Sequence, residues 1–164
     1  MIQKKICLIG VPAVGKTSLV RRFVQGVFSE AYLTTIGVKI DRREVEVEGT
    51  GVRLVVWDIA GDDAYSPLNM GYLRGAAGLL MVADGTRPAT LDRALELAEA
   101  AEVEHGPMSA VLALNKADLV TEWALDADQV ASLRQQMTVL ETSAKTGDGV
   151  EAAFDALALQ TLQP

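Results

Sequence analysis

The chain has 164 residues, 49% hydrophobic and 23% charged, which predicts one globular domain over residues 1–164 and excludes a disordered or low-complexity protein. Its net charge of −7, without a basic tract, argues against binding nucleic acid or an anionic membrane by bulk electrostatics. A single cysteine, Cys7, excludes an internal disulfide, and no apolar run reaches the roughly 20 residues of a membrane helix, so a cytoplasmic protein is predicted.

Short β-branched runs alternate along the chain with longer stretches of helical periodicity. Runs that are apolar at every position indicate parallel strands buried between helix layers, whereas residues 38–47 alternate and suit an antiparallel edge strand. The pattern predicts an α/β fold with a doubly wound, mostly parallel sheet of six strands, one of them antiparallel, and about five helices. In chain order, strands are expected at 6–9, 38–47, 53–57, 79–83, 110–114 and 138–140, and helices include 16–25, 90–104, 129–136 and 150–162.

The first chemical signal is a phosphate-loop pattern, G-x-x-x-x-G-K-[ST], at residues 10–17 between a predicted strand and a predicted helix. Such a loop points successive backbone N–H groups at an anion. Its lysine reaches the β- and γ-phosphates as a point charge, and its final hydroxyl suits Mg²⁺. Alone, the motif predicts a nucleoside triphosphate in any of many enzyme classes. The residues assigned to phosphate and metal binding here are Ala13, Val14, Gly15, Lys16 and Thr17.

A second signal, the run from Asn115 to Asp118, directly follows the predicted strand at 110–114, where ligands bind in an open α/β sheet. A carboxylate there accepts both the ring N–H and the exocyclic amino hydrogen of guanine, and adenine would leave it unpaired at a cost of about 1–3 kcal/mol. Asn115 is expected to tie the loop to its neighbours, and the stem of Lys116 to cover the base. After the next strand, a backbone N–H among Ser143, Ala144 and Lys145 is expected to meet the guanine oxygen.

A third signal, Asp58 and Gly61, closes the predicted strand at 53–57. An acidic residue there can hold a metal-bound water opposite the phosphate loop, and a glycine N–H can reach the γ-phosphate without a side chain in the way. Each of these motifs falls at the end of a predicted strand, which argues against a chance match.

With these motifs in register, the chain from Lys5 to Leu159 resembles the Ras-like small GTPases, most closely the Rab type. Residues 35–37 look like the first switch of that family, residues 57–63 like its second, and residues 72–76 like the stretch after it. The resemblance implies a P-loop G domain that binds GTP or GDP with Mg²⁺ and acts as a switch. It also implies partners, namely an exchange factor, an activating protein and effector proteins.

Some residue roles come from the resemblance alone. It makes Thr35 the second protein ligand of Mg²⁺ beside Thr17, and it gives the N–H of Ser18 to the α-phosphate. Phe28 would pack against the guanine, and Tyr32 would lie near the phosphates when GTP is bound. Without the family, Phe28 reads equally well as ordinary core and Tyr32 as an exposed loop residue.

The chain departs from the family pattern at the catalytic position. Asp62 stands where the family has the glutamine that orients the attacking water. Aspartate is shorter, has no amide to donate and brings a negative charge near the γ-phosphate, so slow hydrolysis is predicted, with Lys16, Gly61 and Asp62 as the catalytic candidates. Pro12 adds a ring beside the γ-phosphate and has no N–H. A non-hydrolysing GTP-binding module is therefore kept as the alternative.

Two further expectations concern lipid anchoring and the choice between GTP and ATP. Membrane-bound members of the family carry C-terminal cysteines for prenylation, and this chain has none after Cys7, so no lipid anchor is expected in it. A prokaryotic member or a trimmed chain would explain that ending. An ATP-using P-loop enzyme is the other rival, and residues 115–118 argue against it.

Overall fold

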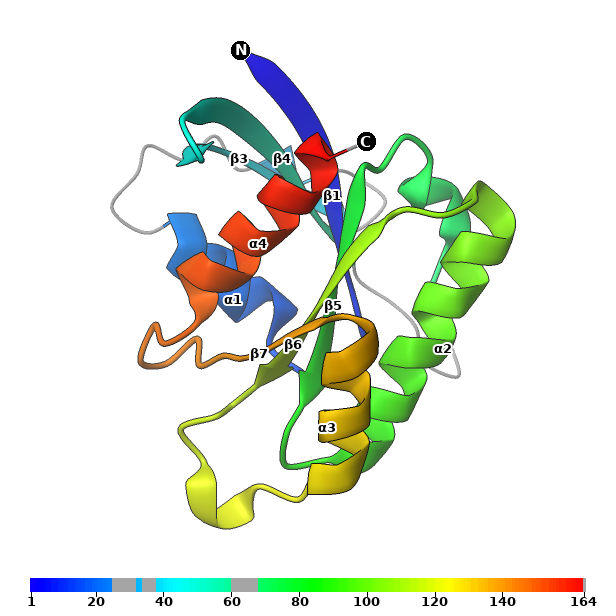
Figure 1. Ribbon diagram of the computed structural model, residues 1–164, viewed down its shortest axis with the longest axis vertical. Helices are drawn as coiled ribbons and strands as arrows, with labels where there is room; N and C mark the ends of the chain where they lie inside the picture. The colour runs from blue at the N-terminus through cyan, green and yellow to red at the C-terminus, as the bar shows by residue number, and fades with distance from the viewer. Residues whose placement is uncertain (25–31, 34–37, 60–67, 164) are drawn as a thin grey trace.

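The computed structural model describes residues 1–24, 32–33, 38–59 and 68–163, with only the backbone of residues 32–33. Its strands form one sheet in the order β2-β3-β4-β1-β5-β6-β7 (Figure 1). The pairs β1–β4, β1–β5, β5–β6 and β6–β7 are parallel, and β2–β3 and β3–β4 are antiparallel. The strands are β1 (Ile2–Ile9), β2 (Tyr32–Leu33), β3 (Val38–Val47), β4 (Thr50–Ile59), β5 (Gly78–Asp84), β6 (Ser109–Asn115) and β7 (Thr138–Glu141).

The predicted fold class is confirmed, with one addition to the strand count. Six strands have four or more residues and correspond to the six predicted ones, and the seventh, β2, has only two residues. Such a short strand has no detectable periodicity in the sequence. The hairpin between β3 and β4 turns at Glu48 and Gly49, whose φ angles of 48° and 79° suit the two-residue turns that follow the twist of paired strands.

In the part of the chain that the structure describes there are four α-helices and two short 3₁₀ helices, so the expected fifth helix is not among them. The helix expected to begin at residue 90 starts two residues earlier at Pro88, an imino acid favoured in the first turn. The helix expected from 129 starts at Ala127, where Asp126 accepts the backbone N–H of Asp128 at 2.8 Å. The helices are α1 (Lys16–Val24), η1 (Met70–Leu73), α2 (Pro88–His105), η2 (Val120–Glu122), α3 (Ala127–Gln136) and α4 (Val150–Leu162).

Two helix layers cover the sheet. One apolar cluster joins α1 and α4 to one face, and there the rings of Phe23 and Phe154 stack with centroids 3.9 Å apart. The other joins α2 and α3 to the opposite face (Figure 1). It includes Cys7, which is buried. Because both faces are covered, the central strands are apolar at nearly every position.

The layers position the loops at one edge of the sheet. The loops after β1, β5, β6 and β7 leave the carboxyl ends of parallel strands, while the N- and C-terminal ends of the chain lie toward the other end (Figure 1). In an open α/β sheet, the crevice outside the carboxyl ends is where ligands bind.

Among the described residues, no helix is both long enough and apolar enough to cross a lipid bilayer.

Candidate functional site

The phosphate loop leaves β1 after Ile9 and enters α1 at Lys16. Its two motif glycines sit where another part of the backbone or a side chain approaches closely. A Cβ on Gly10 would lie 2.5 Å from the carbonyl oxygen of Val82, and one on Gly15 would lie 2.3 Å from Nδ2 of Asn115. Gly15 also has a φ of 103°, which L side chains avoid. The motif glycines are therefore required by the packing of the loop.

The motif lysine lies over its own loop. Lys16 is buried, and its Nζ donates to the carbonyl oxygens of Gly10 at 2.9 Å and Val11 at 3.1 Å. The ammonium group is thus held at the loop, and its contact with the β- and γ-phosphates stays a prediction.

Asn115 joins the loop after β6 to the phosphate loop. Its side chain is buried, and Nδ2 donates to the carbonyl oxygen of Val14 at 2.9 Å. Its Oδ1 accepts from the hydroxyl of Thr142 at 3.1 Å. Asn115 therefore connects three loops at the carboxyl edge, and the prediction that it ties its loop to the neighbours is confirmed.

Asp118 is oriented by a hydroxyl from the next loop. The Oγ of Ser143 donates to Oδ1 of Asp118 at 2.7 Å and accepts the backbone N–H of Thr146 at 3.1 Å. The two motifs after β6 and β7, which lie 25 residues apart at this contact, therefore meet in the structure. Beyond Ser143 lie half-buried Ala144 and exposed Lys145.

A hydroxyl and a carboxylate meet at the other side of the phosphate loop. The Oγ1 of Thr17 donates to Oδ2 of Asp58 at 2.5 Å, and Asp58 is buried at the end of β4. Hard oxygen donors of these two kinds fit Mg²⁺, which keeps several waters and takes few direct protein ligands. The described residues contain no group of three or more His, Cys, Asp or Glu that could hold a metal ion.

Several predicted site residues lie outside the described residues. These are Phe28, Thr35, Gly61 and Asp62, and only the backbone of Tyr32 is described, in β2. Their assignments stay predictions. Ser18 is described and lies exposed on α1, beside a cavity of about 350 Å³ that it lines with Arg21, Arg22 and Ala144.

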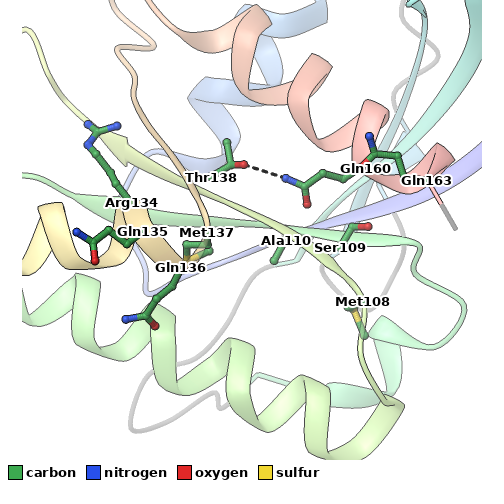
Figure 2. Close-up of a pocket in the computed structure, with 10 residues that line it drawn as sticks. All are labelled: Met108, Ser109, Ala110, Arg134, Gln135, Gln136, Met137, Thr138, Gln160 and Gln163. Carbon is green, nitrogen blue, oxygen red and sulfur yellow. Dashed lines mark hydrogen bonds between the residues drawn. The ribbon is translucent and has the colours of Figure 1, made fainter.

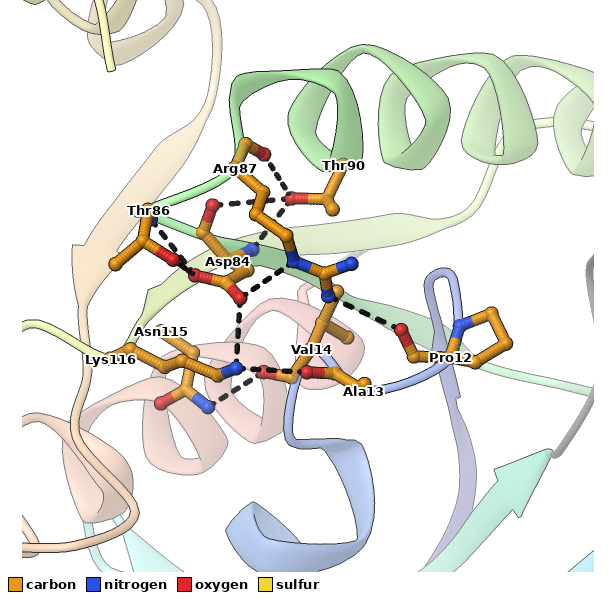
Figure 3. Close-up of polar contacts among 9 residues, drawn as sticks. All are labelled: Pro12, Ala13, Val14, Asp84, Thr86, Arg87, Thr90, Asn115 and Lys116. Atoms are coloured by element: carbon orange, nitrogen blue, oxygen red, sulfur yellow. Dashed lines mark hydrogen bonds and ion pairs between the residues drawn. The ribbon is translucent and has the colours of Figure 1, made fainter. Parts of the chain in front are cut away.

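One cluster at this edge was not predicted from the sequence (Figure 3). Asp84, at the end of β5, is buried and accepts Nζ of Lys116 at 2.8 Å and Nε of Arg87 at 3.0 Å. Burial raises the pKa of Asp84, but hydrogen bonds from Lys116, Thr86 and Arg87 outweigh it and hold the pKa well below its usual value of 3.8. The sequence does carry one signal for this cluster: Asp84 comes at the end of a buried strand, as the motif residues do.

The role expected for Lys116 is extended by this cluster. Its Nζ also donates to the carbonyl oxygen of Ala13 at 3.0 Å, so the ammonium group faces the phosphate loop. That the stem of this lysine covers the base stays a prediction.

A second hollow lies at the far end of the sheet (Figure 2). It has a volume of about 790 Å³ and is lined where β6 and β7 begin and where α3 and α4 end. Gln160 donates to the hydroxyl of Thr138 at 3.1 Å beside it. None of the predicted site residues that the structure describes lines this hollow.

Comparisons of the sequence with known proteins find relatives along nearly the whole chain. The Ras family model matches residues 5–163. Ras-related protein Rab-1 of Theileria annulata is 35% identical over 158 residues, which are 94% of this chain and 72% of that protein. Ras-related protein Rab-1A of Dictyostelium discoideum is 33% identical over 159 residues, 95% of this chain and 79% of that protein. Ras-related protein Rab-13 of Canis lupus familiaris is 33% identical over 161 residues, with coverage of 96% and 79%.

Proposed function

Because this chain belongs to the Ras family and is therefore a GTP-hydrolysing switch that binds guanine nucleotide, we propose that the nucleotide occupies the edge of the sheet where β1, β6 and β7 end. The phosphates would lie against the loop at residues 10–17, and the base would lie between the loops that follow β6 and β7. The observation that carries this proposal is the junction at Asn115, which links these three loops in one arrangement.

Asp118 would select guanine. Its carboxylate is held by Ser143 and would accept the ring N–H and the amino group of the base. Adenine presents no such pair of donors, so the carboxylate would lose hydrogen bonds in an ATP complex. This supports a GTP-specific site over an ATP-using enzyme.

Mg²⁺ would be held by Thr17 and Thr35 directly and by Asp58 through water. The ion would neutralise charge on the β- and γ-phosphates. The contact between Thr17 and Asp58 supports this assignment, because it brings a hydroxyl and a carboxylate to one side of the phosphate loop. If the assignment is right, EDTA accelerates release of bound GDP, whereas release that is indifferent to EDTA contradicts it.

The switch would depend on the γ-phosphate. Thr35 and Gly61 would contact the GTP-bound site and lose those contacts on hydrolysis, so effector proteins would read the GTP form. An exchange factor and an activating protein would set the fraction of GTP-bound protein. One domain over residues 1–164, a cytoplasmic location and the identities of these partners stay predictions.

Hydrolysis would be slow because of Asp62. In phosphoryl transfer the protein contributes mainly by positioning the water and stabilising charge, and a carboxylate beside the γ-phosphate opposes both. Single-turnover GTP hydrolysis by Asp62→Gln tests this: a clear rate increase supports the reasoning. A large decrease would instead make Asp62 a base for the water and overturn it.

The most direct experiment identifies the nucleotide that copurifies with the protein, followed by competition of GTP and ATP for the site. Bound GDP or GTP, displaced by GTP and not by ATP, is the expected result. Competition by ATP at equal concentration would contradict guanine selection. A protein that binds GTP with no measurable turnover, even in the Asp62→Gln variant, would favour the non-hydrolysing alternative.

A further inference from the structure

Three consecutive carbonyl oxygens of the phosphate loop are each held by a side chain from another loop (Figure 3). Asn115 donates to Val14, Lys116 donates to Ala13, and NH2 of Arg87 donates to Pro12 at 3.3 Å. The first two donors belong to the motif after β6. The third, Arg87, comes from the loop between β5 and α2, which carries none of the residues assigned to nucleotide.

The loop has a reason to need such support. Ala13 has a φ of 68°, a left-handed conformation that L residues avoid because Cβ crowds the carbonyl oxygen. The peptide groups on either side of Ala13 carry the carbonyls of Pro12 and of Ala13 itself, and these are the two that Arg87 and Lys116 contact. Both contacts therefore oppose relaxation of the loop at this residue.

Asp84 orients the cation that reaches Pro12. Its side chain is only 1% exposed, and Oδ2 accepts Nε of Arg87 at 3.0 Å. Oδ1 accepts the backbone N–H and the hydroxyl of Thr86 at 2.8 and 2.6 Å, which fixes the direction of the carboxylate. The guanidinium thus spans two acceptors, the buried carboxylate with Nε and the loop carbonyl with NH2.

We propose that Arg87, oriented by Asp84, is a positioning residue that holds the carbonyl of Pro12 and so presets the phosphate loop for the β- and γ-phosphates. This inference rests on the proposed nucleotide site. Pro12 gives the contact particular weight, because a proline has no N–H of its own, so its carbonyl oxygen is the one backbone group of this residue that a hydrogen bond can hold. Loss of Arg87 should therefore loosen the loop and speed release of nucleotide while leaving the fold intact.

The test measures release of a fluorescent GDP analogue in the presence of Mg²⁺ and excess unlabelled GDP. Arg87→Ala is compared with Arg93→Ala, a matched control on α2 whose side chain is 44% exposed against 47% for Arg87 and is paired with Glu96. Removing one hydrogen bond to a loop carbonyl predicts about three- to tenfold faster release for Arg87→Ala. Arg93→Ala should stay within about twofold of the wild type.

Two further variants separate positioning from a general loss of stability. Arg87→Lys keeps the charge but cannot span both acceptors, so its release rate should lie between those of wild type and Arg87→Ala. In an Asp84→Asn background, Arg87→Ala should add less than about twofold, since the arginine is already misoriented.

The outcomes distinguish the two proposals. If the wild type does not bind the GDP analogue, the proposed nucleotide site fails. If the wild type binds it and Arg87→Ala releases it no faster than Arg93→Ala, only the role of Arg87 is overturned. If Arg87→Ala speeds release as much in the Asp84→Asn background as in the wild type, the orienting role of Asp84 is overturned.

Discussion

Replacing Asp118 with asparagine should convert the guanine site into a xanthine site, and the structure predicts how the new amide will point. The hydroxyl of Ser143 accepts from the backbone of Thr146 and so directs its hydrogen toward Oδ1 of Asp118. In the variant only the carbonyl oxygen can accept that hydrogen. The amide NH₂ is therefore placed where the second carboxylate oxygen was.

The cost to guanine follows from this orientation. The base loses one hydrogen bond to a charged acceptor, worth about 1.5–3 kcal/mol, and a donor now faces a donor, which costs about 1–3 kcal/mol more. The sum of about 2.5–6 kcal/mol corresponds to roughly 10²- to 10⁴-fold weaker GDP binding. Xanthine has a carbonyl in place of the amino group and accepts the amide instead, so XDP should bind more tightly to the variant than GDP.

The assay is competition of GDP and XDP against a fluorescent nucleotide analogue. Asp148→Asn is the matched control, because Asp148 is an exposed aspartate in the loop between β7 and α4. Its main chain contacts this region: its carbonyl oxygen accepts the N–H of Ser143, and its N–H donates to the hydroxyl of Thr146. This control variant should leave both affinities unchanged. Unchanged GDP binding by Asp118→Asn would refute the assignment of Asp118, and loss of GDP without gain of XDP would refute the predicted orientation of the amide.

Three other predictions concern the architecture around the site. Gly15→Ala should abolish measurable nucleotide binding and lower the unfolding temperature. The new Cβ would lie 2.3 Å from Nδ2 of Asn115, and the residue has a φ of 103°. Retained binding would contradict this. The pKa of Asp84 is lowered in the folded protein, so the stability that this carboxylate contributes is present above about pH 4 and lost on acidification. The unfolding temperature of Asp84→Asn should therefore fall less steeply below pH 4 than that of the wild type. Gly85→Ala should destabilise the fold by about 1–3 kcal/mol in urea unfolding, because its Cβ would lie 1.9 Å from the ring of Trp123. Gly51→Ala is the control: its Cβ would meet a methionine methyl group at 3.4 Å, so it should cost less than about 1 kcal/mol.

Much of the fold and half of the site can be read from local patterns. The apolar runs of β1, β5 and β6 require burial on both faces, which already implies a parallel sheet between helices. Gly10 and Gly15 lie in the loop after β1, Asp58 lies at the end of β4, and Asp118 lies in the loop after β6, so the edge of the sheet at which they meet is set by chain direction alone. The helix starts were displaced by two residues because a proline in the first turn, Pro88, and an N-cap, Asp126, act locally and outweigh periodicity.

Contacts that join distant segments depended on the tertiary structure. Arg87 reaches Pro12 across 75 positions and Lys116 reaches Ala13 across 103, and neither pair shares a motif or a spacing rule. They meet because β1, β5 and β6 are neighbours in the sheet, an order that hydrophobic pattern leaves undetermined since every buried parallel strand reads alike. The residue types that bind phosphate and guanine are thus encoded locally, whereas the side chains that hold those loops in shape are selected by which strands lie side by side.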